Sequence, residues 1–92
     1  MNVIWSSLAK EYYINIIEQL FEKWNVVIVE DFDSDLNKLI KNISNFNHIC
    51  PKSKVINLHK CIVNKNISLI YRIQNESIEI VTLLFNKSNH LY

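Results

Sequence analysis

The hydrophobic residues change their spacing along the chain, from a helical period in the first half to a period of two in the second. A short β-prone run, Val3–Trp5, comes first, and Ser6 and Ser7 follow it with side chains suited to capping a helix. Apolar residues then recur at three- and four-residue steps over Ala9–Trp24, with charged and amide residues between them. This pattern predicts a short strand followed by an amphipathic helix.

The residues after Asn25 admit two interpretations. The β-branched run 26–29 is compatible with a strand, yet apolar residues continue at helical spacing as far as Ile43. The longer pattern favours a second helix from about Val27 to about Phe46, joined to the first as an antiparallel hairpin. Helical spacing also predicts that the N-terminal aromatic residues belong to the core and do not form a platform for stacking bases, namely Trp5, Tyr12, Tyr13 and Trp24.

Beyond Pro51, which cannot continue a helix, the period falls to two. Alternation predicts three strands, over 56–63, 67–73 and 78–85. The chain turns at 64–66, where asparagine is the best non-glycine residue for a positive φ, and again at 74–77. Strands joined by short turns form an antiparallel meander, and the helical hairpin must cover one of its faces. We therefore predict a single α+β domain over residues 1–92, with the second sheet face free for a macromolecular contact.

Composition limits the chemistry. The chain of 92 residues has no glycine, which excludes glycine-rich phosphate loops, and its two cysteines are too few and too widely spaced for a zinc site or a secreted disulfide framework. Reduced thiols in the cytoplasm are the expectation. The run Asp31–Asp35 lacks the glycine and distal glutamate of a calcium loop, so it is interpreted as a solvated helix face, and no metal or cofactor is expected. The longest apolar run, 26–29, is far too short for a membrane span.

Charge is unevenly distributed although the net charge is only +1. Residues 1–50 carry four lysines and seven carboxylates, whereas residues 51–92 carry six basic and two acidic side chains. A bound polyanion would therefore meet the C-terminal half.

Several segments together resemble the RelE/ParE superfamily of toxins from type II toxin–antitoxin modules. These are Trp5-Ser6 followed by Ala9, the aromatic first helix ending at Trp24, Phe32 and Leu36 in the second helix, Pro51 before the sheet, Tyr71-Arg72-Ile73, and Phe85-Asn86-Lys87-Ser88-Asn89. The resemblance covers almost the whole chain. It implies a ribosome-dependent messenger-RNA nuclease, a gyrase poison or a degenerate relative, neutralised by a cognate antitoxin. Fold alone does not decide among these targets.

Cleavage of RNA by its own 2′-hydroxyl needs a base, cationic donors at the phosphate and an acid for the leaving oxygen. By resemblance, His59 falls near a basic strand residue of RNA-cleaving members, whereas Ser68 replaces their strand arginine. Their tail arginine corresponds to Lys87, or to Asn86 if the register slips by one. The candidate catalytic residues are His59, Lys60, Arg72, Lys87 and Tyr92.

Each candidate also has an ordinary structural interpretation. His59 fits the exposed half of a strand alternation, His90 a residue of a loose tail, and Lys60 a partner for a carboxylate. The low net charge and the single arginine weaken the nuclease hypothesis, because a phosphate-binding surface normally carries many cations. A toxin that binds gyrase needs a recognition surface but no acid–base set.

Two functions of different classes remain open. One is a toxin acting on the translation or DNA-topology machinery, and the other is a non-catalytic, non-toxic binding module of the same fold. In either case the expected protein partner is an extended or helical peptide that packs on the helical hairpin or adds along the sheet.

Overall fold

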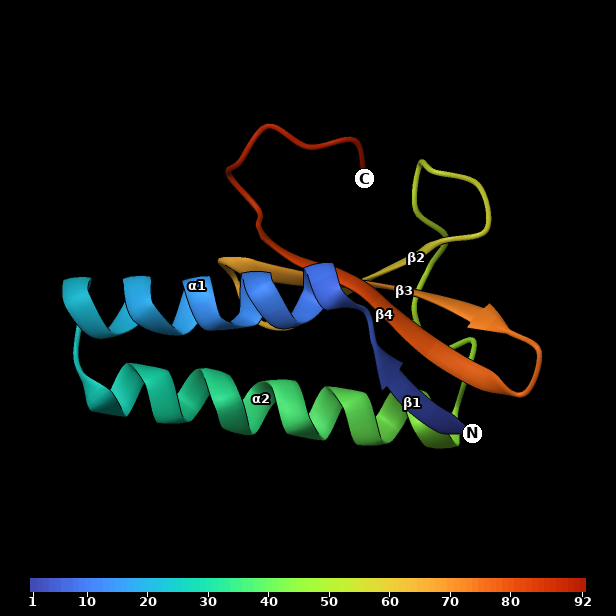
Figure 1. Cartoon of the computed structure of the whole chain (residues 1–92), viewed down its shortest axis with the longest axis horizontal. Coiled ribbons are helices and arrows are strands. Elements are labelled where there is room, and N and C mark those ends of the chain that lie inside the picture. Colours follow the sequence, from blue (N-terminus) through green and yellow to red (C-terminus); the bar gives the residue numbers. More distant parts are fainter.

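A computed structural model describes residues 1–92 and has the predicted α+β architecture (Figure 1). The elements follow one another as β1 (Asn2–Trp5), α1 (Ser7–Lys23), α2 (Val26–Asn45), β2 (His59–Ile62), β3 (Ile67–Gln74) and β4 (Ser77–Phe85). Neither helix is long and apolar enough to cross a membrane. The elements therefore occur in the predicted order. The differences from the prediction lie in where the elements begin and end and in which segments pack on them.

Polar side chains set the start of both helices. The Ser6 hydroxyl accepts a hydrogen bond from the backbone N–H of Ala9 at 2.9 Å, and it donates to the carbonyl oxygen of Val81 at 2.7 Å. The amide oxygen of Asn25 accepts from the backbone N–H of Ile28 at 3.1 Å. This cap makes the β-branched run 26–29 the first turn of α2, as the longer apolar pattern predicts.

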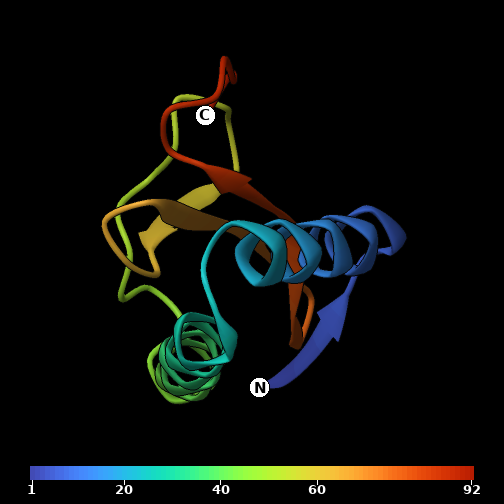
Figure 2. The ribbon, with the colours of Figure 1, turned by 90° about the vertical axis from the view of Figure 1, so that its left-hand side faces the viewer.

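The sheet contains four strands in the order β1-β4-β3-β2. The last three form the predicted antiparallel meander. The N-terminal strand lies parallel to β4, with Asn2 opposite Ser77 and Trp5 opposite Ile80, a pairing that no local pattern indicates. Because β1 borders only the first half of β4, the following helix α1 packs beside the rest of that strand (Figure 2).

Asparagine shapes the turns differently from the prediction. Asn75, between β3 and β4, has a φ of 56°, as expected of a residue that substitutes for glycine. The turn at 64–66 has no positive φ; instead the Asn64 side chain accepts hydrogen bonds from the backbone N–H groups of Asn66 and Ile67. The predicted strand 56–63 is wrong at its start, since β2 begins only at His59 and Asn57 has a φ of 66° in the preceding loop.

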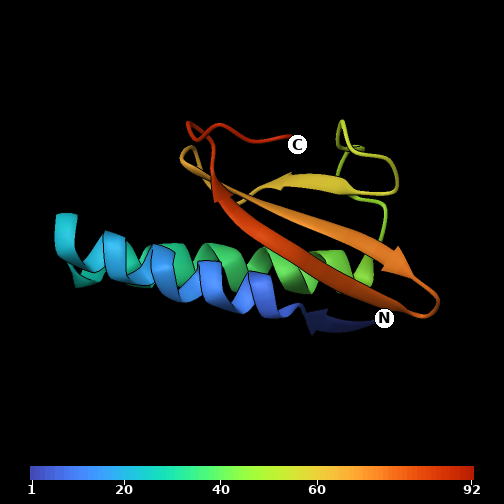
Figure 3. The same cartoon turned by 45° about the horizontal axis from the view of Figure 1, so that its top comes forward.

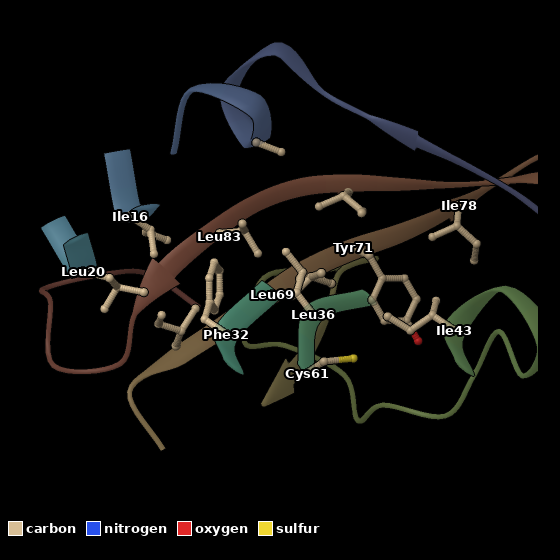
Figure 4. Close-up of a cluster of buried hydrophobic side chains, with 13 residues drawn as sticks. Ile16, Leu20, Phe32, Leu36, Ile43, Cys61, Leu69, Tyr71, Ile78 and Leu83 are labelled. Carbon is tan, nitrogen blue, oxygen red and sulfur yellow. The ribbon is translucent and has the colours of Figure 1, made fainter. Parts of the chain in front are cut away.

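The core lies between the helices and one face of the sheet (Figure 4). Phe32, Leu36 and Ile43 project from α2 towards Leu69 and Tyr71 of β3. Alternation in β2 places Cys61 in this core at 1% exposure, while Ile62 points away and is 71% exposed. The side chains of β2 therefore alternate as in a regular strand, but the buried face is the one that carries His59 and Cys61 and not the one that carries Ile62.

The second face of the sheet is not free, which corrects the prediction. The C-terminal tail and the loop 51–58 lie on the side opposite the helices (Figure 3). The Tyr92 carbonyl oxygen accepts from the Ser53 hydroxyl at 3.3 Å and from the backbone N–H of Lys54 at 3.4 Å, which joins tail to loop. Side chains at the centre of this face are buried, namely Ser68, Ile70, Thr82 and Leu84.

The prediction that all four N-terminal aromatic residues belong to the core is wrong for two of them. Trp5 and Tyr13 pack against the core with ring centroids 5.5 Å apart. Tyr12 is exposed, and Trp24 at the end of α1 is 65% exposed. The helical hairpin extends beyond the sheet in Figures 1 and 3, so the apolar pattern continues where nothing remains to cover it.

Candidate functional site

A ring stack and a backbone hydrogen bond fix the start of β2. His59 lies opposite Tyr71, and their rings stack at 5.0 Å with an interplanar angle of 13°. His59 Nδ1 is 2.9 Å from the carbonyl oxygen of Cys50, which can only accept, so Nδ1 carries the hydrogen and Nε2 is the free nitrogen of the neutral ring. His59 is thus half-buried and oriented, and its interpretation as the exposed half of an alternation is wrong.

Tyr71, the other ring of this stack, connects β3 to the segment that follows α2. Its side chain is buried, and its hydroxyl donates to the carbonyl oxygen of Asn47 at 2.7 Å. Burial raises the pKa of the Tyr71 hydroxyl, an effect that the backbone of Cys50 partly opposes. The phenol therefore acts as a neutral hydrogen-bond donor that ties β3 to the end of α2, a role that the Tyr-x-Ile pattern alone did not indicate.

A disulfide joins Cys50 to Cys61, which contradicts the expectation of reduced thiols. The two residues are 11 positions apart, and their Cα atoms are 5.3 Å apart. Beside the bridge, Lys60 N–H donates to the carbonyl oxygen of Pro51 and Lys52 pairs with His59, so the chain after α2 runs along β2. Sequence spacing missed this pairing because the loop that brings the cysteines together has no regular pattern.

A hollow of about 510 Å³ opens at the start of β2. It is bordered by the loop that precedes the strand and by the end of β3, and its lining includes His48, Lys52, His59 and Arg72 but no acidic side chain. The rings of His48 and His59 lie 5.9 Å apart. The hollow therefore joins two of the predicted residues to His48 and Lys52, which sequence reasoning did not place there.

Arg72 and Lys60 are poorly placed to complete a catalytic group. Arg72 Nε donates to Glu79 Oε1 at 2.7 Å across the β3–β4 pair, so its charge already has a partner. Lys60 alternates with His59 and Cys61 along β2, and its side chain therefore lies on the opposite sheet face, level with Ile70. His59 and Lys60 do not face a common point.

Lys87 and Tyr92 lie apart from the other three candidates. Lys87 borders a hollow of about 260 Å³ at the end of β4 beside Trp24. Tyr92 stacks on His90 with ring centroids 6.2 Å apart, in the tail that covers the sheet. Asn86, the alternative to Lys87, has a structural role, because it accepts from the buried Ser68 hydroxyl and donates to the Lys65 carbonyl.

The acidic run on α2 helps to hold the two helices together. Tyr13 on α1 donates to Asp33 Oδ1 at 2.6 Å. This hydrogen bond, followed by burial and by the charge of Asp33, raises the pKa of Tyr13 to about 12. No group of three or more His, Cys, Asp or Glu side chains is placed to hold a metal ion.

Comparisons with known proteins agree on the type of fold. The family model described as the ParE toxin of the type II toxin–antitoxin system parDE matches residues 3–88. No curated protein matches the sequence. Among solved structures, the chromosomal ParDE system from P. aeruginosa aligns with a TM-score of 0.77 at 15% identity, covering 90% of this chain and 92% of that one. The YoeB/ParE toxin from Agrobacterium tumefaciens gives 0.67 at 13%, covering 94% and 99%. The YoeB–YefM complex from Staphylococcus aureus gives 0.62 at 20%, covering 90% and 93%.

Proposed function

Because this chain belongs to the family of ParE toxins of type II toxin–antitoxin systems, we propose that it arrests growth by binding DNA gyrase and does not cut messenger RNA itself. The single observation that supports this choice is the dispersal of the five candidate residues. His59 and Arg72 line the hollow at the start of β2, and Lys87 lines the one beside Trp24. Tyr92 lines a third hollow, between α1 and the C-terminal tail, and Lys60 lies on the other sheet face. General acid–base cleavage instead needs its groups within hydrogen-bond reach of one phosphate.

The size of the rate enhancement that separated residues cannot supply favours binding over cleavage. Each general acid or base contributes ~10²–10⁴ in rate, and each donor that stabilises charge contributes ~10²–10³. Among the five candidates, His59 Nε2 supplies one such group, and Arg72, the other candidate in the same hollow, is already paired to Glu79. A toxin that inhibits its target by occupying it needs only a complementary surface.

We further propose that a cognate antitoxin neutralises the chain. The partner would be a protein whose extended or helical segment packs on exposed apolar surface of the helical hairpin or adds along the sheet. The exposed apolar residues at the hairpin end support the first mode.

The test is inducible expression with and without the adjacent gene, followed by mapping of transcript ends and of DNA breaks. Growth arrest with DNA breaks, and inhibition of gyrase supercoiling by the purified chain, are the expected results. His59→Ala and Arg72→Ala should leave arrest intact. Transcripts cut at ribosome-bound positions, together with loss of arrest in His59→Ala, would overturn the gyrase proposal.

The second candidate is the ribosome-dependent nuclease, and one observation favours it. The hollow at the start of β2 brings His48, Lys52, His59 and Arg72 together without any acidic lining residue. Transcript cleavage that depends on His59 and Lys52 but not on Lys87 would select this candidate. Expression without any growth defect would instead support the non-toxic binding module.

A further inference from the structure

Two segments, the loop 51–58 and the tail 86–92, form a strap over the second face of the sheet (Figure 3). On that face Ile70 and Leu84 are buried, yet they are the two buried apolar side chains that lie outside the core cluster. No apolar residue of the loop or of the tail belongs to the cluster or packs against it. Few apolar contacts therefore hold the strap, and a segment held in this way opens locally at a low free-energy cost.

The tail is attached at its two ends. At its base, the side chain of Asn86 accepts a hydrogen bond from the buried Ser68 hydroxyl. At its far end, the Tyr92 carbonyl oxygen accepts from the Ser53 hydroxyl and from the backbone N–H of Lys54. The three residues before Tyr92 make no hydrogen bond to the rest of the chain. The position of the tail beyond its base therefore depends on the loop.

The loop is attached to the core through the Cys50–Cys61 disulfide. Cys61 is 1% exposed and belongs to the core cluster, and the bridge closes the whole loop. The other links are backbone hydrogen bonds across the base of the loop, such as the one from Lys60 N–H to the Pro51 carbonyl oxygen, and so short a two-stranded unit is marginally stable alone. In the chain-entropy model, a covalent link across 11 positions disfavours the disordered forms of the loop by about 100-fold.

We propose that the Cys50–Cys61 disulfide is a redox latch, which keeps the strap closed when it is oxidised and releases the loop and the tail when a dithiol reduces it. A thiolate of the dithiol attacks Sγ of Cys50, the more exposed of the two sulfur-bearing residues, and Cys61 leaves as a thiolate that takes up a proton. The second thiol of the dithiol then displaces Cys50. In total the bridge gains two electrons and two protons, and the dithiol becomes a disulfide.

Release of the strap changes what the sheet presents to solvent. The uncovered face has Ser68 opposite Leu84 and Ile70 opposite Thr82, all of them buried in the closed form. His90 Nδ1 in the tail is the one buried side-chain nitrogen or oxygen without a hydrogen-bond partner, and release lets it bond to water. The reduced form thus has the free second face that the sequence predicts, and this inference does not depend on which target the chain binds.

The test compares the oxidised chain with the same chain kept reduced by a phosphine. Alkylation after unfolding, followed by mass measurement, counts the free thiols in each sample. Methyl resonances are then recorded with a soluble paramagnetic probe, which broadens the signals of groups that solvent reaches. The Ile70 and Leu84 methyl signals should broaden on reduction. Leu69 and Leu83, their neighbours on the core face, are the matched controls and should stay sharp.

Proteolysis measures the strap itself. An enzyme that lacks disulfides and cleaves before apolar residues should cut before Val55 in the loop and before Leu91 in the tail. Both cuts should be at least ~10-fold faster in the reduced chain, because cleavage follows the population of the open form. Cleavage before Leu36, a buried residue of α2, should stay within ~3-fold.

Two variants separate the latch from the strap. Cys50→Ala/Cys61→Ala should have a fast-cleaved strap with or without phosphine. Removal of residues 89–92 should uncover Leu84 in both redox states, while cleavage of the loop still depends on the phosphine.

Three results would overturn the latch. In the first, the reduced chain has two free thiols and Ile70 and Leu84 stay as shielded as before, so the disulfide only adds stability. In the second, Leu69 and Leu83 become accessible together with them, so reduction unfolds the whole sheet. In the third, the chain keeps two free thiols under oxidising conditions, so no bridge exists to act as a latch.

Discussion

Reduction of the Cys50–Cys61 disulfide should lower the stability of the fold by an amount that follows from the length of the loop. The bridge spans 11 positions. In the chain-entropy model, opening a loop of this size returns conformational freedom to the unfolded chain that corresponds to roughly 3 kcal/mol at 25 °C. For a domain of this size that is a decrease in Tm of roughly 10 to 20 °C.

The assay is urea unfolding of the wild-type chain with and without a phosphine reductant. This comparison removes no atoms from the core, whereas substitution of Cys61, which is 1% exposed, would add the cost of a cavity. The double variant Cys50→Ala/Cys61→Ala is the control, because its unfolding should not respond to the reductant. The m value, the steepness with which the free energy of unfolding decreases with urea, should rise on reduction, because the unfolded chain without the cross-link exposes more surface.

The loss of stability on reduction should also be largest in the segments next to the disulfide. The loop 51–58 is anchored by the bridge, and through Ser53 and Lys54 it holds the Tyr92 carbonyl of the tail. Hydrogen exchange should therefore accelerate in the loop and in the tail before it does so in β3 and β4. A stability change below about 1 kcal/mol, or unchanged exchange in the loop and the tail, would refute this reasoning.

Two further predictions concern single side chains. Tyr13→Phe should cost about 1–2 kcal/mol in urea unfolding, because the phenol donates to the charged carboxylate of Asp33. The pKa of Tyr13, about 12, is raised above that of the unfolded chain, so this contribution is fully present below pH ~10 and is lost as pH rises towards 12. Ultraviolet titration should show one phenol that ionises near pH 12 in the wild type and is missing in Tyr13→Phe. Asn75→Ala should destabilise by about 1 kcal/mol because alanine disfavours a φ of 56°, whereas Asn75→Gly should be near neutral; equal unfolding midpoints for the two variants would contradict this.

Much of the fold could be predicted from the sequence because the spacing of apolar residues indicates each helix and strand locally. A period of 3.6 identified both helices, including the β-branched start of α2, and a period of two identified the three meander strands. The turn around Asn75 was also predicted, although its positive φ was expected at the 64–66 turn instead. These features depend on neighbours within a few residues, which a single sequence displays directly.

The candidate site was predicted less well, because its geometry depends on contacts between distant segments. The sequence named His59 and Arg72, and the hollow at the start of β2 contains both, but their partners His48 and Lys52 come from an irregular loop. Lys87 and Tyr92 lie near positions of a family pattern and Lys60 follows His59 in the sequence, yet alternation and the path of the tail separate the three in space.

Apolar periodicity determines which side of a helix avoids water but not whether another layer reaches it. Trp24 has the spacing of a core residue, and it is exposed because the sheet ends before α1 does. Tertiary structure likewise decided that β1 joins β4, that Cys50 meets Cys61, and that the tail covers the second sheet face. In each case the contact joins residues whose separation along the chain leaves no periodic signal, so only the packed chain defines it.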